Sequence, residues 1–185
     1  MMKRIFDVFV SLFLLVLFAP IFLIISVLIK VDSQGPVLFK QVRIGKNGKN
    51  FNIYKFRSMK GGAESTGPHF TSKNDVRITS IGKIIRKSSL DEIPQLYNVL
   101  VGDMSLVGPR PNVPLQREEY TEREWCKRNS VRPGITGLAQ ATLRSSATKQ
   151  QRTNLDLEYV ENASFFYDMN ILCLTVKQVV SRGGN

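Results

Sequence analysis

The fold is decided first by Val8–Ile29, VFVSLFLLVLFAPIFLIISVLI, a run of 22 consecutive residues without a charge. Nineteen of these residues are apolar, and they include four of the eleven phenylalanines in the chain. As a single helix rising about 1.5 Å per residue, the run would be roughly 33 Å long, enough to cross a hydrocarbon core of roughly 30 Å. A cleavable signal peptide is disfavoured, because no small-x-small cleavage site follows the run before Lys30. The sequence therefore predicts a membrane segment near the amino terminus.

The flanks and the middle of this run favour a helix that enters and leaves the membrane on the same side. Basic residues precede and follow it: Lys3 and Arg4, then Lys30, Lys40, Arg43 and Lys46. Positive charge on both flanks favours the cytoplasmic side for both ends. Pro20, in the middle, removes one backbone donor and bends the helix. We expect a re-entrant membrane helix with a bend at Pro20 over residues 1–32, and full spanning stays open because prolines also occur in spanning helices.

The remaining 153 residues, 33–185, suffice for one cytoplasmic domain with its own core. They hold 23 basic and 13 acidic residues, so they carry +10 of the total formal charge of +11. An anionic partner is therefore expected. Nucleic acid is disfavoured, because the basic residues are not interleaved with aromatic residues as in a known nucleic-acid module. Attachment to a membrane already accounts for the charge.

The scarcity of histidine and cysteine limits the kinds of catalytic, metal-binding and disulfide chemistry expected of the chain. His69 is the one histidine, which disfavours His-based catalytic pairs and multi-histidine metal sites. Cys126 and Cys173 lie 47 positions apart without Cys-x-x-Cys spacing, so neither a disulfide framework nor a structural zinc site is indicated. Carboxylates are expected to carry any catalysis, in a reducing compartment.

The pattern after residue 33 predicts an α+β fold that is mostly helical with a short β-hairpin. Val37–Val42 and Phe51–Phe56 are β-prone runs, separated by a turn that contains Asn47-Gly48. Isoleucines at helical spacing over residues 78–85 predict one helix, and a second is expected from Leu90 to about Val101. A third should cover Ser164–Val180, either in the core or as an interfacial amphipathic helix on the membrane. Residues 60–75 are expected to form a surface loop, which either closes over a ligand or has no role.

Two adjacent carboxylates open the second of these helices. Ser89-Leu90-Asp91-Glu92 has the spacing of a capping box, and the helix N-terminus is expected to keep Asp91 and Glu92 ionised. An ionised carboxylate there acts as a nucleophile or binds Mg²⁺. Acidic residues in a first turn are also ordinary capping groups, so both interpretations remain open at this point.

Rigid basic groups surround this candidate site in the sequence. Arg110 lies between two prolines, Pro109 and Pro111, and a guanidinium on a stiff turn is suited to phosphate oxygens. The other candidates are Lys55 on the second hairpin strand, Arg86 before the carboxylates, and Arg144. Each of them taken alone is more commonly a solvated surface charge.

Four longer motifs, taken together, resemble the bacterial sugar transferases, specifically the small monotopic phosphoglycosyl transferases. These motifs are Lys55–Met59 (KFRSM), Arg86–Leu100 (RKSSLDEIPQLYNVL), Gly102–Pro111 (GDMSLVGPRP) and Arg132–Gly137 (RPGITG). The resemblance covers essentially the whole chain, from the hydrophobic segment to the last helix. It implies that the domain at 33–185 is catalytic and acts at the cytoplasmic face of the bacterial inner membrane.

The resemblance also implies a reaction in two steps. The aspartate of the Asp-Glu pair attacks the β-phosphorus of a UDP-sugar and releases UMP, which leaves a covalent phosphosugar on the enzyme. Undecaprenyl phosphate, a polyprenol phosphate, then takes the phosphosugar and leaves as the polyprenol-diphosphate-sugar, the first membrane step of glycoconjugate synthesis. Mg²⁺ is the expected cofactor, and membrane lipid is an expected partner; oligomerisation is left open.

Carried over position by position, the family pattern implies Asp91 as nucleophile and metal ligand, with Glu92 as its partner. Substrate binding is then expected of a wider set, which comprises Lys55, Arg86, Arg110, Pro111, Arg144 and Asp156. One departure is visible, because the family usually has Ser-Pro at the membrane bend and this chain has Ala19-Pro20. The bend angle is in question for that reason, since a serine hydrogen bond to the backbone is lost.

Two alternatives compete with this interpretation. One is a glycosyltransferase that moves the sugar alone and releases UDP, although no Asp-x-Asp motif supports it. The other is a membrane-anchored, non-catalytic scaffold of a polysaccharide assembly complex, in which Asp91 and Glu92 would be capping residues. The sequence does not identify the sugar.

Overall fold

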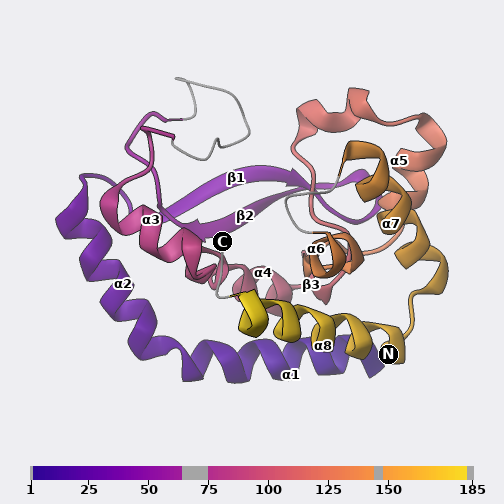
Figure 1. Ribbon diagram of the computed structural model, residues 1–185, viewed down its shortest axis with the longest axis horizontal. Coiled ribbons are helices and arrows are strands. Elements are labelled where there is room, and N and C mark those ends of the chain that lie inside the picture. The colour runs from indigo at the N-terminus through magenta and orange to yellow at the C-terminus, as the bar shows by residue number, and fades with distance from the viewer. Residues whose placement is uncertain (1, 64–74, 144–147, 183–185) are drawn as a thin grey trace.

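The computed structural model describes residues 2–63, 75–143 and 148–182, and it has the predicted α+β composition (Figure 1). The helices are α1 (Met2–Leu17), α2 (Ala19–Asp32), α3 (Ser80–Lys87), α4 (Gln95–Val101), α5 (Glu122–Arg128), α6 (Leu138–Thr142), α7 (Lys149–Asn162) and α8 (Phe165–Arg182). Three short 3₁₀ turns are η1 (Lys46–Gly48), η2 (Leu90–Glu92) and η3 (Pro114–Glu119). The strands are β1 (Leu38–Ile44), β2 (Asn50–Phe56), β3 (Ser105–Val107) and β4 (Gly134–Thr136).

The amino-terminal apolar run forms two helices, α1 and α2, which are bent by 60° at the break between them. Pro20 lies in the first turn of α2, where its missing N–H costs no helical hydrogen bond. The predicted bend at this proline is therefore confirmed. Within the described residues, no single helix meets the length and hydropathy needed to cross a membrane, whereas α1 and α2 meet them as a bent pair.

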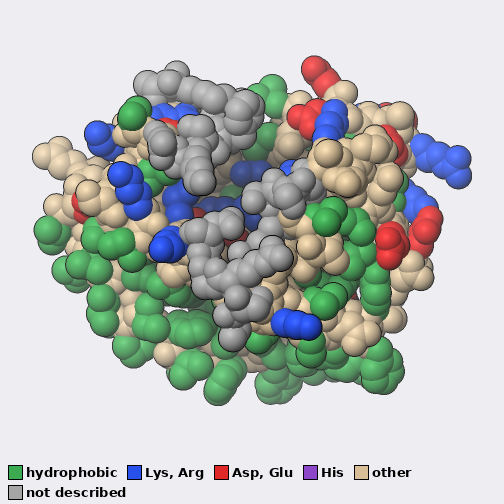
Figure 2. All heavy atoms as spheres, in the orientation of Figure 1, with side chains coloured by type: hydrophobic (Ala, Val, Ile, Leu, Met, Phe, Trp, Pro, Cys, Tyr) green, Lys and Arg blue, Asp and Glu red, His purple; other side chains and the backbone are tan. Residues whose placement is uncertain are grey.

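The outer surface of this helix pair is apolar. Phe9, Phe13, Leu23 and Val31 are all more than 60% exposed. Figure 2 shows hydrophobic side chains gathered along the lower edge of the molecule, where α1 and α2 lie in Figure 1. The inner surface contributes to two cores: Phe6 and Val10 pack on the larger one, while Ile25 and Ile29 belong to the smaller.

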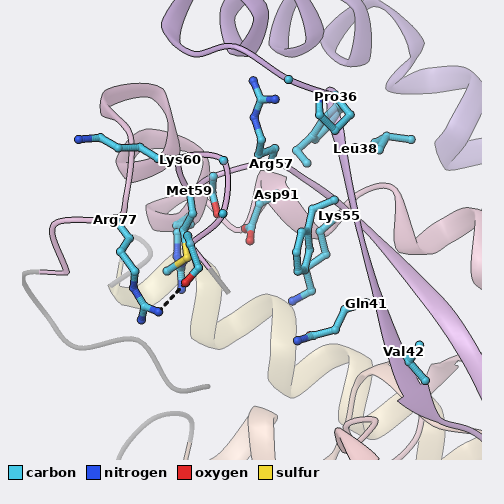
Figure 3. Close-up of a pocket in the computed structure, with 18 of the residues that line it drawn as sticks. Pro36, Leu38, Gln41, Val42, Lys55, Arg57, Met59, Lys60, Arg77 and Asp91 are labelled. Atoms are coloured by element: carbon cyan, nitrogen blue, oxygen red, sulfur yellow. Dashed lines mark hydrogen bonds between the residues drawn. The ribbon is translucent and has the colours of Figure 1, made fainter. Parts of the chain in front are cut away.

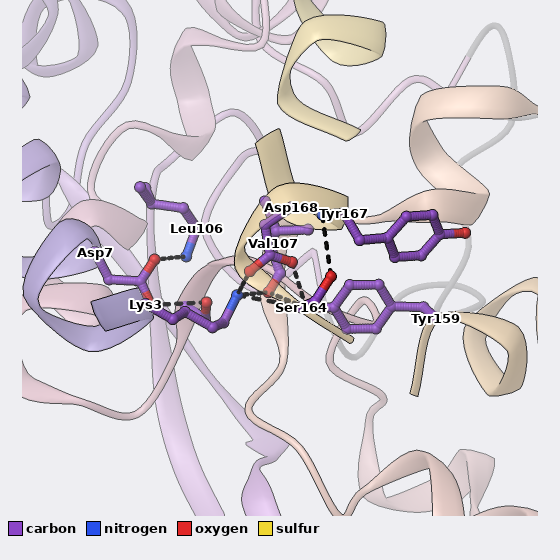
Figure 4. A network of polar contacts seen from close by, with 9 residues as sticks. Lys3, Asp7, Leu106, Val107, Tyr159, Ser164, Tyr167 and Asp168 are labelled. Carbon is purple, nitrogen blue, oxygen red and sulfur yellow. Dashed lines mark hydrogen bonds and ion pairs between the residues drawn. The ribbon is translucent and has the colours of Figure 1, made fainter. Parts of the chain in front are cut away.

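Polar side chains at the start of α1 attach it to the rest of the protein (Figure 4). The Lys3 ammonium forms an ion pair with Asp168 of α8 and donates to the Val107 carbonyl at 3.1 Å. The Tyr159 hydroxyl of α7 donates to Asp168 Oδ1 at 2.8 Å, so three helices meet at one carboxylate. The Arg4 guanidinium donates to the last carbonyls of α4 at Val99 (2.5 Å) and Leu100 (2.9 Å).

The far end of α2 is attached in a similar way. Arg57, directly after β2, donates to the carbonyl oxygens of Ile29 (3.3 Å) and Ser33 (2.6 Å) at the carboxyl end of the helix. Asp32 Oδ2 accepts from the Ile81 N–H at 3.1 Å, in the first turn of α3. Both contacts involve segments that carry candidate site residues: Arg57 follows Lys55 by two positions, and α3 contains Arg86.

The predicted hairpin is confirmed, with slightly different bounds. β1 and β2 pair antiparallel from Leu38 opposite Phe56 to Ile44 opposite Asn50. In the turn, Asn47 (φ 57°) and Gly48 (φ 73°) both adopt the left-handed conformation, which asparagine and glycine accept most readily. The predicted carboxyl-terminal helix is α8, whose buried side includes Ile171 and Asp168 and whose other side exposes Phe166 and Val176.

Several elements were not predicted. α7 is a polar helix, and β3 and β4 form a parallel pair of three residues each. Glycines allow that pair to sit close, because a Cβ at Gly134 would lie 2.1 Å from the Gly108 nitrogen. Most of the predicted 60–75 loop, including His69, lies outside the described residues. The division at residue 32 stays a prediction, although residues on both sides of it share the two cores.

Replacing Asp7 with alanine should destabilise the protein. Asp7 is 3% exposed in α1 and accepts from Ser105 Oγ (2.8 Å) and from the Leu106 N–H (3.2 Å), so its loss leaves buried donors unpaired. We expect the free energy of unfolding to fall by about 1.5–3 kcal/mol. Equilibrium denaturation in detergent micelles measures it. The matched variant Glu118→Ala, which removes an exposed carboxylate, should change it by less than about 0.5 kcal/mol; equal losses in both would refute this role of Asp7.

Candidate active site

Asp91 and Glu92 lie in η2, a single 3₁₀ turn between α3 and α4. The predicted continuous helix from Leu90 is wrong, because Pro94 has no N–H to donate and α4 begins only at Gln95. The predicted capping box is also wrong. Ser89 adopts a left-handed conformation (φ 57°), and its side chain caps no backbone N–H. Ser89 and Glu92 therefore do not form a capping box; the Glu92 side chain contacts two cations, and Asp91 lines a pocket.

Glu92 binds two cations with one oxygen. Lys55 Nζ of β2 donates to Glu92 Oε1 at 2.6 Å, and Arg110 Nη2 donates to the same oxygen at 2.8 Å. Burial acts to raise the pKa of Glu92, but Arg110 and Lys55 outweigh it, so the pKa of this carboxyl lies well below its usual range. Glu92 is thus a fixed anion that joins the hairpin, η2 and the loop after β3.

The two cations respond in opposite ways. Burial lowers the pKa of Lys55, with Arg110 acting in the same direction and Glu92 against it. Glu92 raises the pKa of Arg110. The negative charge of Glu92 thus holds the positive charges of Lys55 and Arg110 together, and these three side chains carry a net positive charge.

Asp91 has a different environment from its neighbour. Burial raises the pKa of Asp91, Glu92 adds to this, and Lys55, Arg86 and Arg110 oppose it. Asp91 and Glu92 lie in a three-residue turn with little dipole, so the helix N-terminus expected to keep both ionised is absent, and burial has the largest effect on the pKa of Asp91. A carboxylate with a raised pKa is a better nucleophile than an ordinary aspartate once it is ionised.

Asp91 lines a pocket of about 640 Å³ between the hairpin, α3 and η3. Figure 3 shows its carboxylate pointing into this pocket, with Lys55 on one side and Met59 and Arg77 on the other. Basic residues along the wall are Arg43, Lys55, Arg57, Lys60, Arg77 and Arg86. Lys and Arg side chains surround a hollow in the face that Figure 2 shows. Such a pocket is suited to a ligand with several negative charges.

Arg43 belongs to this site, whereas the sequence places it only among the charges that flank the apolar amino-terminal run. Its Nη1 donates to the Pro111 carbonyl at 3.0 Å, and its Nη2 donates to Gln41 Oε1 at 2.6 Å. Burial, with Arg110 nearby, lowers the pKa of Arg43 to about 10, so it stays charged at neutral pH. Strand alternation places it on the same face as Gln41, a signal that the sequence contains.

The other predicted site residues are distributed as follows. Lys55 and Arg86 line the pocket with Asp91, whereas Arg110 does not line it and pairs with Glu92 beside it. Pro111 contributes a backbone carbonyl rather than its ring. Asp156 does not line the pocket; it is buried on α7 in an ion pair with Arg128. Arg144 lies outside the described residues.

The side chains that could ligate a metal ion determine which kind of metal site fits this pocket. Among residues 2–63, 75–143 and 148–182, no three His, Cys, Asp or Glu side chains come together as a metal site. Asp91 is the acidic residue among the described residues that line the pocket. An ion such as Mg²⁺ commonly uses one or two carboxylates together with phosphate oxygens of a ligand, and Asp91 suits that arrangement.

Known proteins match this chain over almost its whole length. The sequence model of the bacterial sugar transferase family matches residues 1–182. A protein of Bacillus subtilis described as an uncharacterised sugar transferase is 45% identical over 183 residues, which cover 99% of this chain and 89% of that protein.

Two relatives with more specific names are longer. A UDP-glucose:undecaprenyl-phosphate glucose-1-phosphate transferase of Klebsiella pneumoniae is 42% identical over 94% of this chain. A UDP-N-acetylgalactosamine-undecaprenyl-phosphate N-acetylgalactosaminephosphotransferase of Aeromonas hydrophila is 40% identical over 98% of it. The matched regions make up 39% and 44% of those two proteins.

The charges around Asp91 predict how its pKa depends on Glu92. Glu92→Gln should lower the pKa of Asp91, because the anion that raises it is removed while Lys55, Arg86 and Arg110 remain. ¹³C NMR of carboxyl-labelled aspartate measures this, with the Asp91 signal assigned from Asp91→Asn. In the control Glu119→Gln, which removes an exposed carboxylate paired with Lys149, the Asp91 titration should not move. An unchanged or higher pKa of Asp91 in Glu92→Gln would contradict the arrangement.

Proposed function

The chain belongs to the bacterial sugar transferase family, and from this premise we propose that it is a phosphoglycosyl transferase. It moves a sugar 1-phosphate from a UDP-sugar to undecaprenyl phosphate and releases UMP, as an early membrane step in making a glycoconjugate such as a polysaccharide. The names of the relatives support the two substrates. The observation that carries the proposal is the Asp91 carboxylate inside a pocket lined with cations.

The pocket supplies what a sugar-diphosphate donor needs. Three of its cations come from separate elements: Arg43 from β1, Lys55 from β2 and Arg86 from α3. Their convergence gives positive charge along two phosphate groups rather than at a single point. The volume of about 640 Å³ lies within the range of roughly 300–1,000 Å³ that small-ligand sites occupy.

In the proposed first step, an Asp91 oxygen attacks the β-phosphorus of the donor. A new bond forms between this oxygen and phosphorus, and the bond from the β-phosphorus to the bridging oxygen breaks. UMP leaves with the bridging oxygen and its electron pair, and the sugar phosphate stays on Asp91. Lys55 and Arg86 lie where they can offset the charge that develops on the phosphoryl oxygens.

In the second step, a phosphate oxygen of the acceptor attacks the same phosphorus. The bond between phosphorus and the Asp91 oxygen breaks, which restores the carboxylate and releases undecaprenyl-diphosphate-sugar. Two displacements at one phosphorus replace one direct displacement between two anions. Glu92 stays ionised throughout and holds Lys55 and Arg110 in place.

Mg²⁺ is the proposed cofactor, with Asp91 as its protein ligand. When bound, it would neutralise charge on the diphosphate and polarise the phosphorus. The basic side chains of the pocket wall do the same from the other sides.

The proposed location is the cytoplasmic face of the bacterial inner membrane. The bent pair of α1 and α2, apolar on its outer surface, supports a re-entrant insertion in which both ends of residues 1–32 remain on that face. A lipid-linked acceptor then reaches the pocket without leaving the membrane.

Nucleotide release separates this proposal from its two alternatives. The detergent-solubilised protein, given Mg²⁺, undecaprenyl phosphate and a panel of UDP-sugars, should release UMP with at least one donor. Asp91→Asn should lower the rate by about 10³-fold or more, because the nucleophile is lost. Asp103→Asn, an aspartate outside the pocket, should keep the rate. UDP instead of UMP would indicate a glycosyltransferase, and no nucleotide with any donor would favour the scaffold.

The covalent intermediate has its own test. With a donor labelled with ³²P at the β-phosphate and no acceptor, label should remain on the denatured protein in proportion to the UMP released. Adding undecaprenyl phosphate should move it to lipid. Asp91→Asn should carry no label. UMP release that requires acceptor, with an unlabelled protein, would replace the two-step mechanism by direct transfer.

A further inference from the structure

The loop that carries Arg110 is held at four consecutive backbone carbonyls. Pro109 accepts from the Gly134 N–H (3.0 Å), Pro111 from Arg43 Nη1 (3.0 Å), and Asn112 from the Ile44 N–H (2.9 Å). The carbonyl of Arg110 itself accepts from Arg128 Nη2 at 2.5 Å. The backbone of the residue that contacts Glu92 is therefore fixed by a side chain from another part of the chain.

Arg128 is an unusual donor for this purpose. It is the last residue of α5, and its side chain is 2% exposed, as is that of Asp156 on α7. Both Nε and Nη2 of Arg128 lie 2.8 Å from Asp156 Oδ2, and the centroid of the Tyr120 ring lies 5.5 Å from the guanidinium carbon. One guanidinium thus serves the ion pair and the Arg110 carbonyl together.

Stability of the fold does not by itself explain why Arg128 and Asp156 form a fully buried ion pair. Removing two charges from water is costly, and apolar residues of similar volume often stabilise a protein at least as well. The same two helices carry a second ion pair, Lys127 with Glu161, which is exposed and contacts nothing in the site. What distinguishes the buried pair is its bond to Arg110.

We propose that Arg128 and Asp156 are positioning residues, which hold the Arg110 backbone so that its guanidinium stays on Glu92. Asp156 orients Arg128, Arg128 fixes the Arg110 carbonyl, and Arg110 Nη2 then meets Glu92 Oε1 at 2.8 Å. The consequence for catalysis rests on the proposed function. Asp156, which the sequence suggested as a substrate ligand, acts through two other residues and touches no substrate.

The test separates positioning from simple stability. Removing one partner alone leaves a buried charge and threatens the fold, so the main variant is the double substitution Arg128→Met with Asp156→Leu. The matched control removes the exposed pair between the same helices by Lys127→Met with Glu161→Leu. Each protein is measured for its thermal midpoint, for kcat and KM in UMP release, and for the rate at which phenylglyoxal modifies Arg110, read by peptide mass spectrometry.

We expect the buried-pair variant to keep its thermal midpoint within a few degrees and to lose about tenfold to a hundredfold in kcat, with a smaller change in KM. Its Arg110 should react severalfold faster, because the guanidinium leaves Glu92 more often. The control should match the unsubstituted protein in all three. Normal kcat and normal Arg110 reactivity in a folded buried-pair variant would overturn the proposal, and so would an equal loss in the control.

Arg128→Lys keeps the test decisive if the double variant does not fold. The lysine retains a charge for Asp156 but lacks the fork that reaches both partners, so we expect the same kcat loss and the same faster Arg110 labelling. Normal values of both in this variant would overturn the proposal. Arg110 labelling needs no turnover, so absence of UMP release from the unsubstituted protein would count against the proposed function and leave this inference to be decided by the labelling rates.

Discussion

One carboxylate oxygen, Glu92 Oε1, joins the segments that make the pocket. It accepts from Lys55 on β2 and from Arg110 on the loop after β3, and it belongs to the turn that presents Asp91. Without this anion, two cations would lie side by side, Lys55 mostly buried and Arg110 partly exposed, and their repulsion would cost free energy. With it, the hairpin, η2 and the loop after β3 are held in a fixed relation. The pocket around Asp91 depends on that relation.

The same contact explains why two adjacent carboxylates behave differently. Glu92 takes the short contacts to Lys55 and Arg110, so its ionised form is strongly favoured. Asp91 keeps burial and a like-charged neighbour, which raise its pKa and leave its oxygens available to a ligand. The 3₁₀ turn makes this possible, because successive side chains on a turn with about three residues per turn point in different directions. One acid supports the site while the other faces the substrate.

The sequence allowed much of this to be predicted where the pattern is local. The bend at Pro20, the Asn47-Gly48 hairpin and the last helix follow from proline geometry, turn chemistry and periodicity. The elements that escaped prediction lack such a local signal. β3 and β4 have three residues each, and their pairing depends on Gly108 meeting Gly134 across 26 positions. α7 is polar over most of its length, although Thr148 and Gln151 form a capping box that marked its start.

The attachment of α1 and α2 shows how the bend persists with alanine rather than serine before Pro20. The outer end of α1 is held by Lys3, Arg4 and Asp7, whose polar partners lie on α8, α4 and β3. The outer end of α2 is held by Arg57, two positions after Lys55. An angle that is fixed at both ends of the pair does not depend on one hydrogen bond at its apex. Arg57 follows the strand that carries Lys55, so the contact that holds the outer end of α2 also ties that helix to the strand that lines the pocket.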